Sequence, residues 1–238
     1  MIFAAGLGSR LAPLTDNKPK ALVEFQGRTM LENVAAKLVK AGCNRLIINV
    51  HHFAPVMKRF IESHDFGAEV FISDETDFLL DTGGGILKAQ KLLEKEEDTL
   101  LYNVDIFSDL DINGILKYHV ENQNLATLAV KDRESTRKLV FDSQMRLCAW
   151  KNFTNGEKKI SREYSDDDVK ELAFSGISVI NKSIFSKITE TGKFSITNLY
   201  LRLASSEKVC GYLHGGIWAD LGTVEKLKAA EKLTKTCT

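Results

Sequence analysis

The sequence predicts an α/β fold: a Rossmann-like, mostly parallel mixed sheet flanked by helices, with a smaller antiparallel part in the second half. In the first half, apolar runs such as Arg45–Val50 alternate with amphipathic helical patterns, and strands separated by helices usually pair in parallel. After residue 125 the apolar runs follow one another closely, which is typical of antiparallel strands. With neither an internal repeat nor a low-complexity linker, residues 1–238 are expected to form a single domain.

The elements of the first half follow from this alternation. Met30, Val34, Leu38 and Val39 share one helical face, and Gly42 suits the C-terminal end of that helix. The expected elements, in chain order, are a strand at 1–5, a helix from 30 to 42, a strand at 45–50, a helix at 55–62, a strand at 68–72, a helix at 86–93 and a strand at 99–104.

The second half begins with three closely spaced strands, and the polar stretch at 152–168 behind them is expected to be exposed. The terminal helix is amphipathic, with Leu227, Ala230 and Leu233 facing inward. The expected elements are strands at 125–132, 137–144, 145–152 and 172–180, a helix at 197–204, a strand at 209–213 and a helix at 223–233.

Charge and cysteine usage exclude several classes of protein. Lys+Arg 32 balance Asp+Glu 32, so no global charge indicates a nucleic-acid or membrane partner. The chain has no apolar stretch long enough to span a bilayer and no basic region typical of a signal peptide. Widely spaced cysteines without a C-x-x-C pair indicate reduced thiols and a cytoplasmic protein. They are Cys43, Cys148, Cys210 and Cys237.

A glycine-rich turn after the first strand is the first candidate binding site. Gly6 and Gly8 allow a backbone that can aim N–H groups at phosphate oxygens, and Arg10 and Lys20 add two cations beside it. A G-x-G turn alone is equally consistent with a tight turn, and the stretch matches neither the Rossmann fingerprint nor the P-loop.

The longer pattern G-x-G-S-R-L-x-P-L-T-x-x-x-P-K, from Gly6 to Lys20, resembles the signature of the sugar-1-phosphate nucleotidyltransferase family. The resemblance covers nearly the whole chain. It implies that residues 1–131 mainly bind the nucleotide, while 132–238 mainly bind the sugar phosphate and supply a second metal ligand. It also implies Mg²⁺ as cofactor, with a nucleoside triphosphate and a sugar 1-phosphate as the bound partners.

Two aspartates are the candidate metal ligands. Asp105 ends the run Leu100–Asp105, at the strand edge where open α/β sheets bind ligands. Asp220 precedes a helix whose N-cap would be Thr223. Each could instead cap a turn, but two carboxylates and bound phosphates are the usual ligands of Mg²⁺. The pair resembles the two metal-binding aspartates of the family.

The nucleotide contacts are expected at the first turn and at a second cluster of glycines. In Asp81–Ile86 three glycines precede a helix, whose N-terminus would offer free N–H groups to a base or sugar. His51 could line the same pocket, although a capping or merely exposed histidine is at least as plausible an interpretation. The candidate nucleotide-binding residues are Ala5, Gly6, Gly8, Ser9, His51, Thr82, Gly83 and Gly84.

The sugar side departs from the family. Ser175-Gly176 replaces the usual Glu-Gly and resembles the F-S-G-I-S of family members that act on N-acetylmuramate 1-phosphate, as does T-G-G-G-I at 82–86. The family's E-K-P segment is replaced by Ala149–Asn152, which leaves the role of Lys151 open. The candidate sugar-phosphate contacts are Asn103, Ser175, Gly176 and Asn198.

The expected reaction transfers a nucleotidyl group, from UTP, to N-acetylmuramate 1-phosphate in cell-wall peptidoglycan recycling. Arg10 and Lys20 are the candidate catalytic residues, with Arg10 on the leaving phosphates and Lys20 on the α-phosphate. Transfer to mannose, glucose or heptose 1-phosphate remains an alternative, as does an inactive nucleotide-sugar sensor. The sequence does not indicate an oligomeric state.

Overall fold

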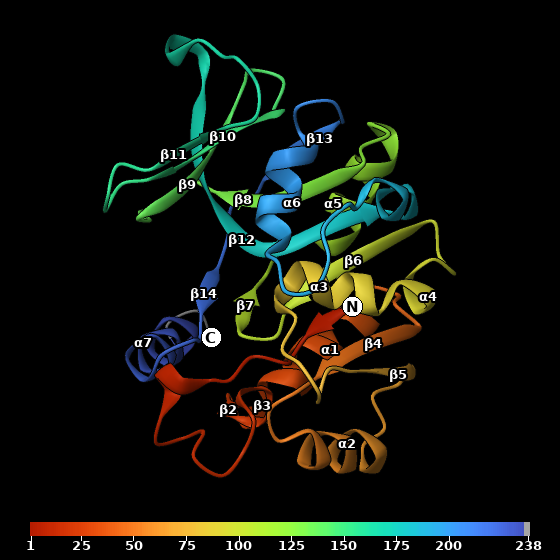
Figure 1. The fold of residues 1–238 in the computed structure, drawn as a ribbon. Coiled ribbons are helices and arrows are strands. Elements are labelled where there is room, and N and C mark those ends of the chain that lie inside the picture. Colours follow the sequence, from red (N-terminus) through yellow and green to blue (C-terminus); the bar gives the residue numbers. More distant parts are fainter. Residues whose placement is uncertain (236–238) are drawn as a thin grey trace.

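A ten-stranded mixed sheet forms the centre of the computed structural model, which describes residues 1–235 (Figure 1). One half of the sheet is parallel, with the strand order β6-β1-β4-β5. These strands are β1 (Ile2–Phe3), β4 (Arg45–Val50), β5 (Glu69–Asp74) and β6 (Asp98–Asn103). The β-branched residues of β4 are buried on both faces, as expected for a parallel strand between helices.

The long strand β12 (Lys170–Asn181) joins this half to the antiparallel part. It runs antiparallel to β6 on one side and to β8 on the other, and its first residues pair with β9. Figure 1 shows β9, β10 and β11 extending away from the main sheet. Strands β9 and β10 were predicted, whereas β11 lies in the exposed polar stretch, where no strand was expected. The bounds are β8 (Ala126–Lys131), β9 (Arg137–Phe141), β10 (Leu147–Asn152), β11 (Lys158–Ile160) and β13 (Val209–Leu213), the last parallel to β8.

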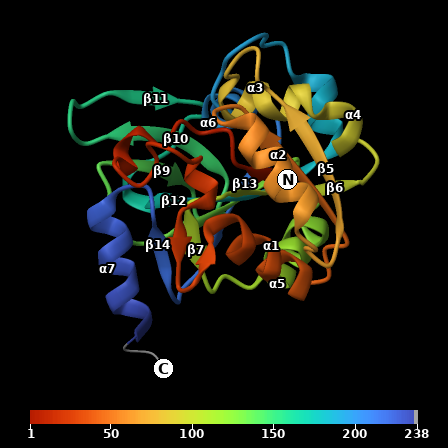
Figure 2. The ribbon, with the colours of Figure 1, turned by 90° about the horizontal axis from the view of Figure 1, so that it is seen from below.

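Helices cover both faces of the sheet, which confirms the predicted fold class (Figure 2). Neighbouring residues of β4 take opposite sides: Ile48 belongs to the core cluster that contains buried residues of α1, α2 and α5, whereas Ile47 belongs to the cluster with those of α3, α4 and α6. The helices are α1 (Met30–Lys40), α2 (Ala54–Ser63), α3 (Asp81–Lys88), α4 (Gln90–Leu93), α5 (Ile112–Glu121) and α6 (Ile196–Leu203). None of the helices described is long and apolar enough to cross a membrane.

Two predicted helices differ from the structure. The glycines of 83–85 lie inside α3, not in a loop before a helix, because missing side chains let α3 pack against Phe194 and Gly192. The final helix, α7 (Val224–Lys235), buries Leu227 and Ala230 as predicted, but Leu233 is 56% exposed. The prediction for Leu233 was wrong because that end of α7 extends past the sheet (Figure 2).

Three of the four cysteines, at positions 43, 148 and 210, are free thiols, and Cys237 lies outside the described residues.

Helix α5 was not predicted. Two short strand pairs complete the fold: β2 (Glu24–Phe25) with β3 (Arg28–Thr29), and β7 (Ile106–Ser108) with β14 (Trp218–Asp220).

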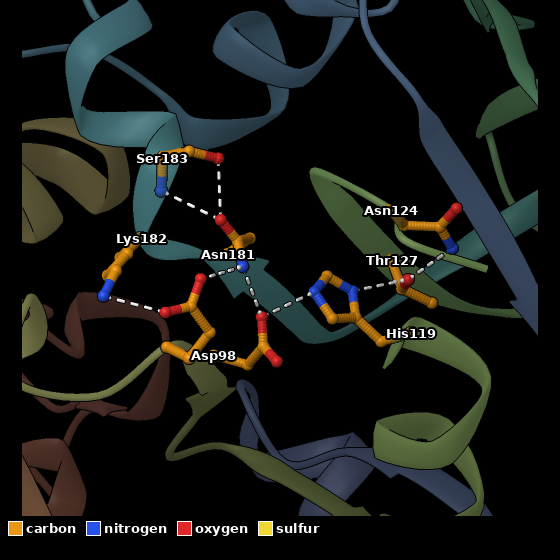
Figure 3. Close-up of polar contacts among 8 residues, drawn as sticks. Asp98, His119, Asn124, Thr127, Asn181, Lys182 and Ser183 are labelled. Carbon is orange, nitrogen blue, oxygen red and sulfur yellow. Dashed lines mark hydrogen bonds and ion pairs between the residues drawn. The ribbon is translucent and has the colours of Figure 1, made fainter. Parts of the chain in front are cut away.

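The buried His119 connects α5 to the first residues of β6 and β8 through hydrogen bonds (Figure 3). His119 is 1% exposed; its Nε2 lies 3.2 Å from Asp98 Oδ1 and its Nδ1 lies 2.8 Å from Thr127 Oγ1. Asn124 donates to Thr127, and Asn181 donates to Asp98. Burial lowers the pKa of His119, and the opposing attraction of Asp98 does not restore it. The network therefore suits the neutral imidazole.

We predict that this histidine makes the fold less stable in acid. The folded-state pKa of His119 lies below the usual 6.5, so the unfolded chain binds more protons than the folded protein as pH falls. The contribution of His119 to the free energy of unfolding is therefore complete above pH 6.5 and is lost as pH falls. Urea unfolding between pH 5 and 8 should show a weaker pH dependence for His119→Gln than for the wild type. The exposed His52→Gln is the control. Equal slopes for His119→Gln and wild type would contradict the prediction.

Candidate active site

The glycine-rich turn packs closely against Lys20. Gly8 has a left-handed backbone, with φ of 69°, and a Cβ there would lie 2.9 Å from Lys20 Cβ. Thr15 Oγ1 donates to the Gly8 carbonyl at 2.9 Å, which holds the returning chain against the turn. Glycine is therefore required at this position by both conformation and space. Ser9 and Arg10, in the short helix Ser9–Leu11, are exposed above this turn.

The two aspartates are brought together from positions far apart in the chain. Asp105 follows β6 at its carboxyl end, as predicted, and its carbonyl accepts a hydrogen bond from Leu221 N at 2.8 Å. Asp220 ends β14, which pairs with β7. A Cβ on Gly222 would lie 2.7 Å from Asp220 Oδ1, 3.3 Å from Asp105 Oδ2 and 3.4 Å from Arg10 Nη2. The three groups thus surround one point.

Lysines balance the two carboxylates: Lys20 forms an ion pair with Asp105, and Lys226 forms one with Asp220. Burial opposes ionisation of Asp220, but Lys226 and the Gly222 N–H outweigh it and hold the pKa below its usual range. Residues 1–235 contain no cluster of three or more His, Cys, Asp or Glu that could hold a metal. Two carboxylates near one point nevertheless suit Mg²⁺, which takes its remaining ligands from phosphates and water.

A cavity lies on each side of this point. One, of about 370 Å³, contains Lys20 and Asp105 and is also lined by Ala5, Gly6, Asn103 and Thr82. The other, of about 800 Å³, contains Arg10 and Asp220 and extends to β9 and β10 of the antiparallel part. The reaction centre therefore stands between two compartments.

Glu75 is a buried carboxylate in the smaller cavity that the sequence reasoning missed. Its Oε1 accepts from Asn49 Nδ2 at 2.7 Å, and Asn49 Oδ1 accepts from Ala4 N at 2.6 Å. Burial raises the pKa of Glu75, although the Asn49 hydrogen bond opposes the rise. Glu75 directly follows β5, so the strand-edge rule that identified Asp105 could have found it.

The second cluster of glycines contributes less than expected. The N–H groups of Gly83 and Gly84 donate to the Phe194 carbonyl, at 2.9 and 3.3 Å, so they are not free for a ligand. Thr82 lines the smaller cavity beside them. His51 Nδ1 contacts the Glu75 carbonyl at 2.7 Å, and its side chain lies outside the lining of that cavity.

The candidate sugar contacts are divided among three places. Ser175 is fully buried, with its hydroxyl 2.8 Å from His214 Nε2, so the structure does not bring its side chain to a cavity. Gly176, with φ of 74°, leaves room for Asn103, whose Nδ2 would lie 2.9 Å from a Cβ. Asn198 lines a third cavity, of about 430 Å³, and contacts Lys159 at 3.4 Å.

Lys151 does not face these cavities. Its Nζ lies 2.7 Å from Glu171 and 3.8 Å from Asp166. Trp150 and Asn152 lie on the other face of β10 from Lys151, because side chains alternate along a strand. Trp150 lines the third cavity and Asn152 lines the larger one. The larger cavity carries two arginines that the sequence reasoning missed, Arg133 and Arg137.

The chain is similar in sequence to known proteins over nearly its whole length. The profile described as "Nucleotidyl transferase" matches residues 1–236. The N-acetylmuramate alpha-1-phosphate uridylyltransferase of Caulobacter vibrioides is 30% identical over 97% of this chain and 94% of its own length. A mannose-1-phosphate guanyltransferase of Gibberella zeae is 32% identical over 58% of this chain and 38% of its own length.

Solved structures show the same fold. A UDP-glucose pyrophosphorylase, solved in complex with UDP-glucose, has a TM-score of 0.78 and 16% identity, covering 100% of this chain and 98% of that one. The match of the family profile over nearly all residues, joined to this fold, decides the assignment. The chain belongs to the Nucleotidyl transferase family.

Proposed function

We propose that the protein transfers a uridylyl group from UTP to N-acetylmuramate 1-phosphate, forming a nucleotide-sugar and pyrophosphate for the recycling of cell-wall sugar. The observation that carries the proposal is the meeting of Arg10, Asp105 and Asp220 around one point, with Lys20 on Asp105 and a cavity on either side. The similarity to the Caulobacter vibrioides uridylyltransferase, over 97% of this chain and 94% of that protein, supports the choice of substrates.

The chemistry needs charge neutralisation more than proton transfer. An oxygen of the sugar phosphate attacks the α-phosphorus of the triphosphate, and the bond from that phosphorus to the bridging oxygen breaks as pyrophosphate leaves. A phosphate monoester with a second pKa of about 6 is mostly ionised at neutral pH, so no general base is required. Lys20 would neutralise the α-phosphate and the incoming phosphate, and Arg10 the leaving group.

Asp105 and Asp220 would hold Mg²⁺ between them, since their carboxylates border one point and no third acidic ligand in residues 1–235 competes for it. The ion would supply positive charge next to the α-phosphate. Lys20 and Lys226, which now neutralise the carboxylates, would then be free to turn to phosphate oxygens.

The base would occupy the smaller cavity, where Thr82 and the buried Glu75 provide hydrogen-bonding groups. A carboxylate oxygen is an acceptor for the ring N–H of uracil. The expectation was that backbone groups of the glycine cluster would hydrogen-bond to the base. The N–H groups of Gly83 and Gly84 already donate to Phe194, so side chains are proposed here instead.

Two other functions compete with this proposal. The similarity to a mannose-1-phosphate guanyltransferase favours a different sugar and base, although it covers only 58% of the chain. An inactive nucleotide-sugar sensor would use the same fold, but it would not require Arg10, Lys20 and both aspartates together. Product formation across a panel of triphosphates and sugar phosphates separates the three.

We predict that pyrophosphate release is fastest with UTP and N-acetylmuramate 1-phosphate and that Asp105→Asn lowers kcat by about 100-fold or more. The reason is the loss of one charge from the pair that would hold the metal. Asp65→Asn, on an exposed loop where asparagine keeps the hydrogen bond to Gly67, is the matched control. No release with any pairing would favour the sensor, and a better rate with mannose 1-phosphate and GTP would favour the guanylyltransferase.

We predict that a chelator abolishes turnover and that Mg²⁺ restores it. Asp220→Asn should raise the Mg²⁺ concentration needed for half-maximal rate, because one of two charged ligands becomes neutral. The measurement is the initial rate of pyrophosphate release against Mg²⁺ for wild type and variant. Full activity after chelation, or the same Mg²⁺ dependence in both proteins, would contradict the assignment.

We predict that Gly222→Ala lowers kcat/KM by on the order of 100-fold while the protein stays folded. Gly222 has no left-handed backbone, so alanine suits its conformation, but the new methyl group would displace the Asp220 carboxylate, 2.7 Å away. Gly215→Ala is the control, since its Cβ would have no atom within 4 Å. Unchanged kinetics in Gly222→Ala would show that the two carboxylates need not keep this arrangement.

A further inference from the structure

The larger cavity, of about 800 Å³, extends well beyond the reaction centre. It begins at Arg10 and Asp220 and reaches Arg137 on β9 and Asn152 on β10. Cations outnumber acids in its lining, because Arg10, Arg133, Arg137 and Lys226 face only Glu134 and Asp220. Such a lining favours an anionic ligand.

Three of these four cations are already engaged by the protein or placed at the reaction centre. Lys226 neutralises Asp220, and Arg10 stands at the reaction centre. The Arg133 guanidinium lies 3.8 Å from the ring centre of Trp218 and donates to the carbonyls of Phe174 and Glu134, each at 3.2 Å. Arg133 is therefore held in place by the protein itself.

Arg137 is different. It is exposed, and across the part of the chain that the structure describes its guanidinium makes neither a hydrogen bond nor an ion pair. The proposed transfer gives it no role, since the phosphates lie at the aspartates. It also lines the third cavity together with Ser135, so it stands where the two cavities meet.

Asn152 completes a pair of donors with Arg137. The two residues are direct cross-strand partners in the β9–β10 ladder, so their side chains lie on the same face. Asn152 Oδ1 accepts from Thr154 N at 3.0 Å, and the amide N–H groups of Asn152 make no hydrogen bond within residues 1–235, so they are available as donors. A planar guanidinium beside an amide is suited to a carboxylate, which accepts on both oxygens.

We propose that Arg137, assisted by Asn152, binds a carboxylate carried by the sugar and thereby selects an acidic sugar 1-phosphate. The inference rests on the proposed function and assigns its sugar specificity to a residue. N-acetylmuramate carries its carboxylate on the substituent of O3, two carbons along the ring from C1, which bears the phosphate. With the phosphate at the aspartates, the acid extends away from the reaction centre, the direction in which the cavity reaches Arg137.

The test compares two sugars that differ by the acidic substituent, N-acetylmuramate 1-phosphate and N-acetylglucosamine 1-phosphate. We expect Arg137→Ala to lower kcat/KM for the acidic sugar by about 10- to 100-fold, mainly through KM, and to change the neutral sugar little. Arg137→Lys should recover part of the loss, because an ammonium keeps the charge without the fork. Arg59→Ala, an exposed arginine on α2, is the control for loss of a surface charge.

Other results would overturn the inference. An equal loss for both sugars would assign Arg137 to the phosphate or to the sheet, and no loss for either would remove it from the site. A wild type that uses both sugars equally well would leave the transfer reaction standing and reject the carboxylate contact. A wild type active only with neutral sugar phosphates would reject both this inference and the proposed substrate.

Discussion

The site depends on holding two carboxylates together. Asp105 and Asp220 come from distant parts of the chain, and the Leu221 N–H bonded to the Asp105 carbonyl fixes their backbones side by side. Two carboxylates that border one point repel each other, so such a pair requires cations nearby. Lys20 and Lys226 provide them, and Gly222 leaves the space between the carboxylates open.

Strand β12 makes the second compartment possible. Its pairing with β8 shifts register between Phe174 and Ser178, which lets the strand leave the parallel half and start the antiparallel one. Gly176 lies in this shift, with φ of 74°, and the missing side chain admits Asn103. The register shift in β12 therefore shapes both cavities: it places Asn103 in the smaller one and directs β9 and β10 toward the larger one.

The sequence predicted what depends on local patterning. The alternation of strands and helices, the strand-edge position of Asp105 and the close turn at Gly8 follow from residue type and spacing. Features decided by distant packing were not predictable. Gly83 is helical because Phe194, more than a hundred residues away in the chain, lies against it. Ser175 is buried because His214 bonds its hydroxyl.

Arginine and lysine have separate tasks in the site, and their chemistry explains the division. The lysines beside Asp105 and Asp220 are compact charges that neutralise a carboxylate and would turn to a phosphate if the proposed metal ion took their place. Arg10 and Arg137 have no partner in residues 1–235, and their planar forks are suited to two oxygens of one anion. Because the net charge of the chain is zero, unpaired arginines in a cavity cannot be explained by a general excess of basic residues. Their place in the lining of one cavity therefore favours two separate anionic groups there, the leaving phosphates at Arg10 and an acidic group of the acceptor sugar at Arg137.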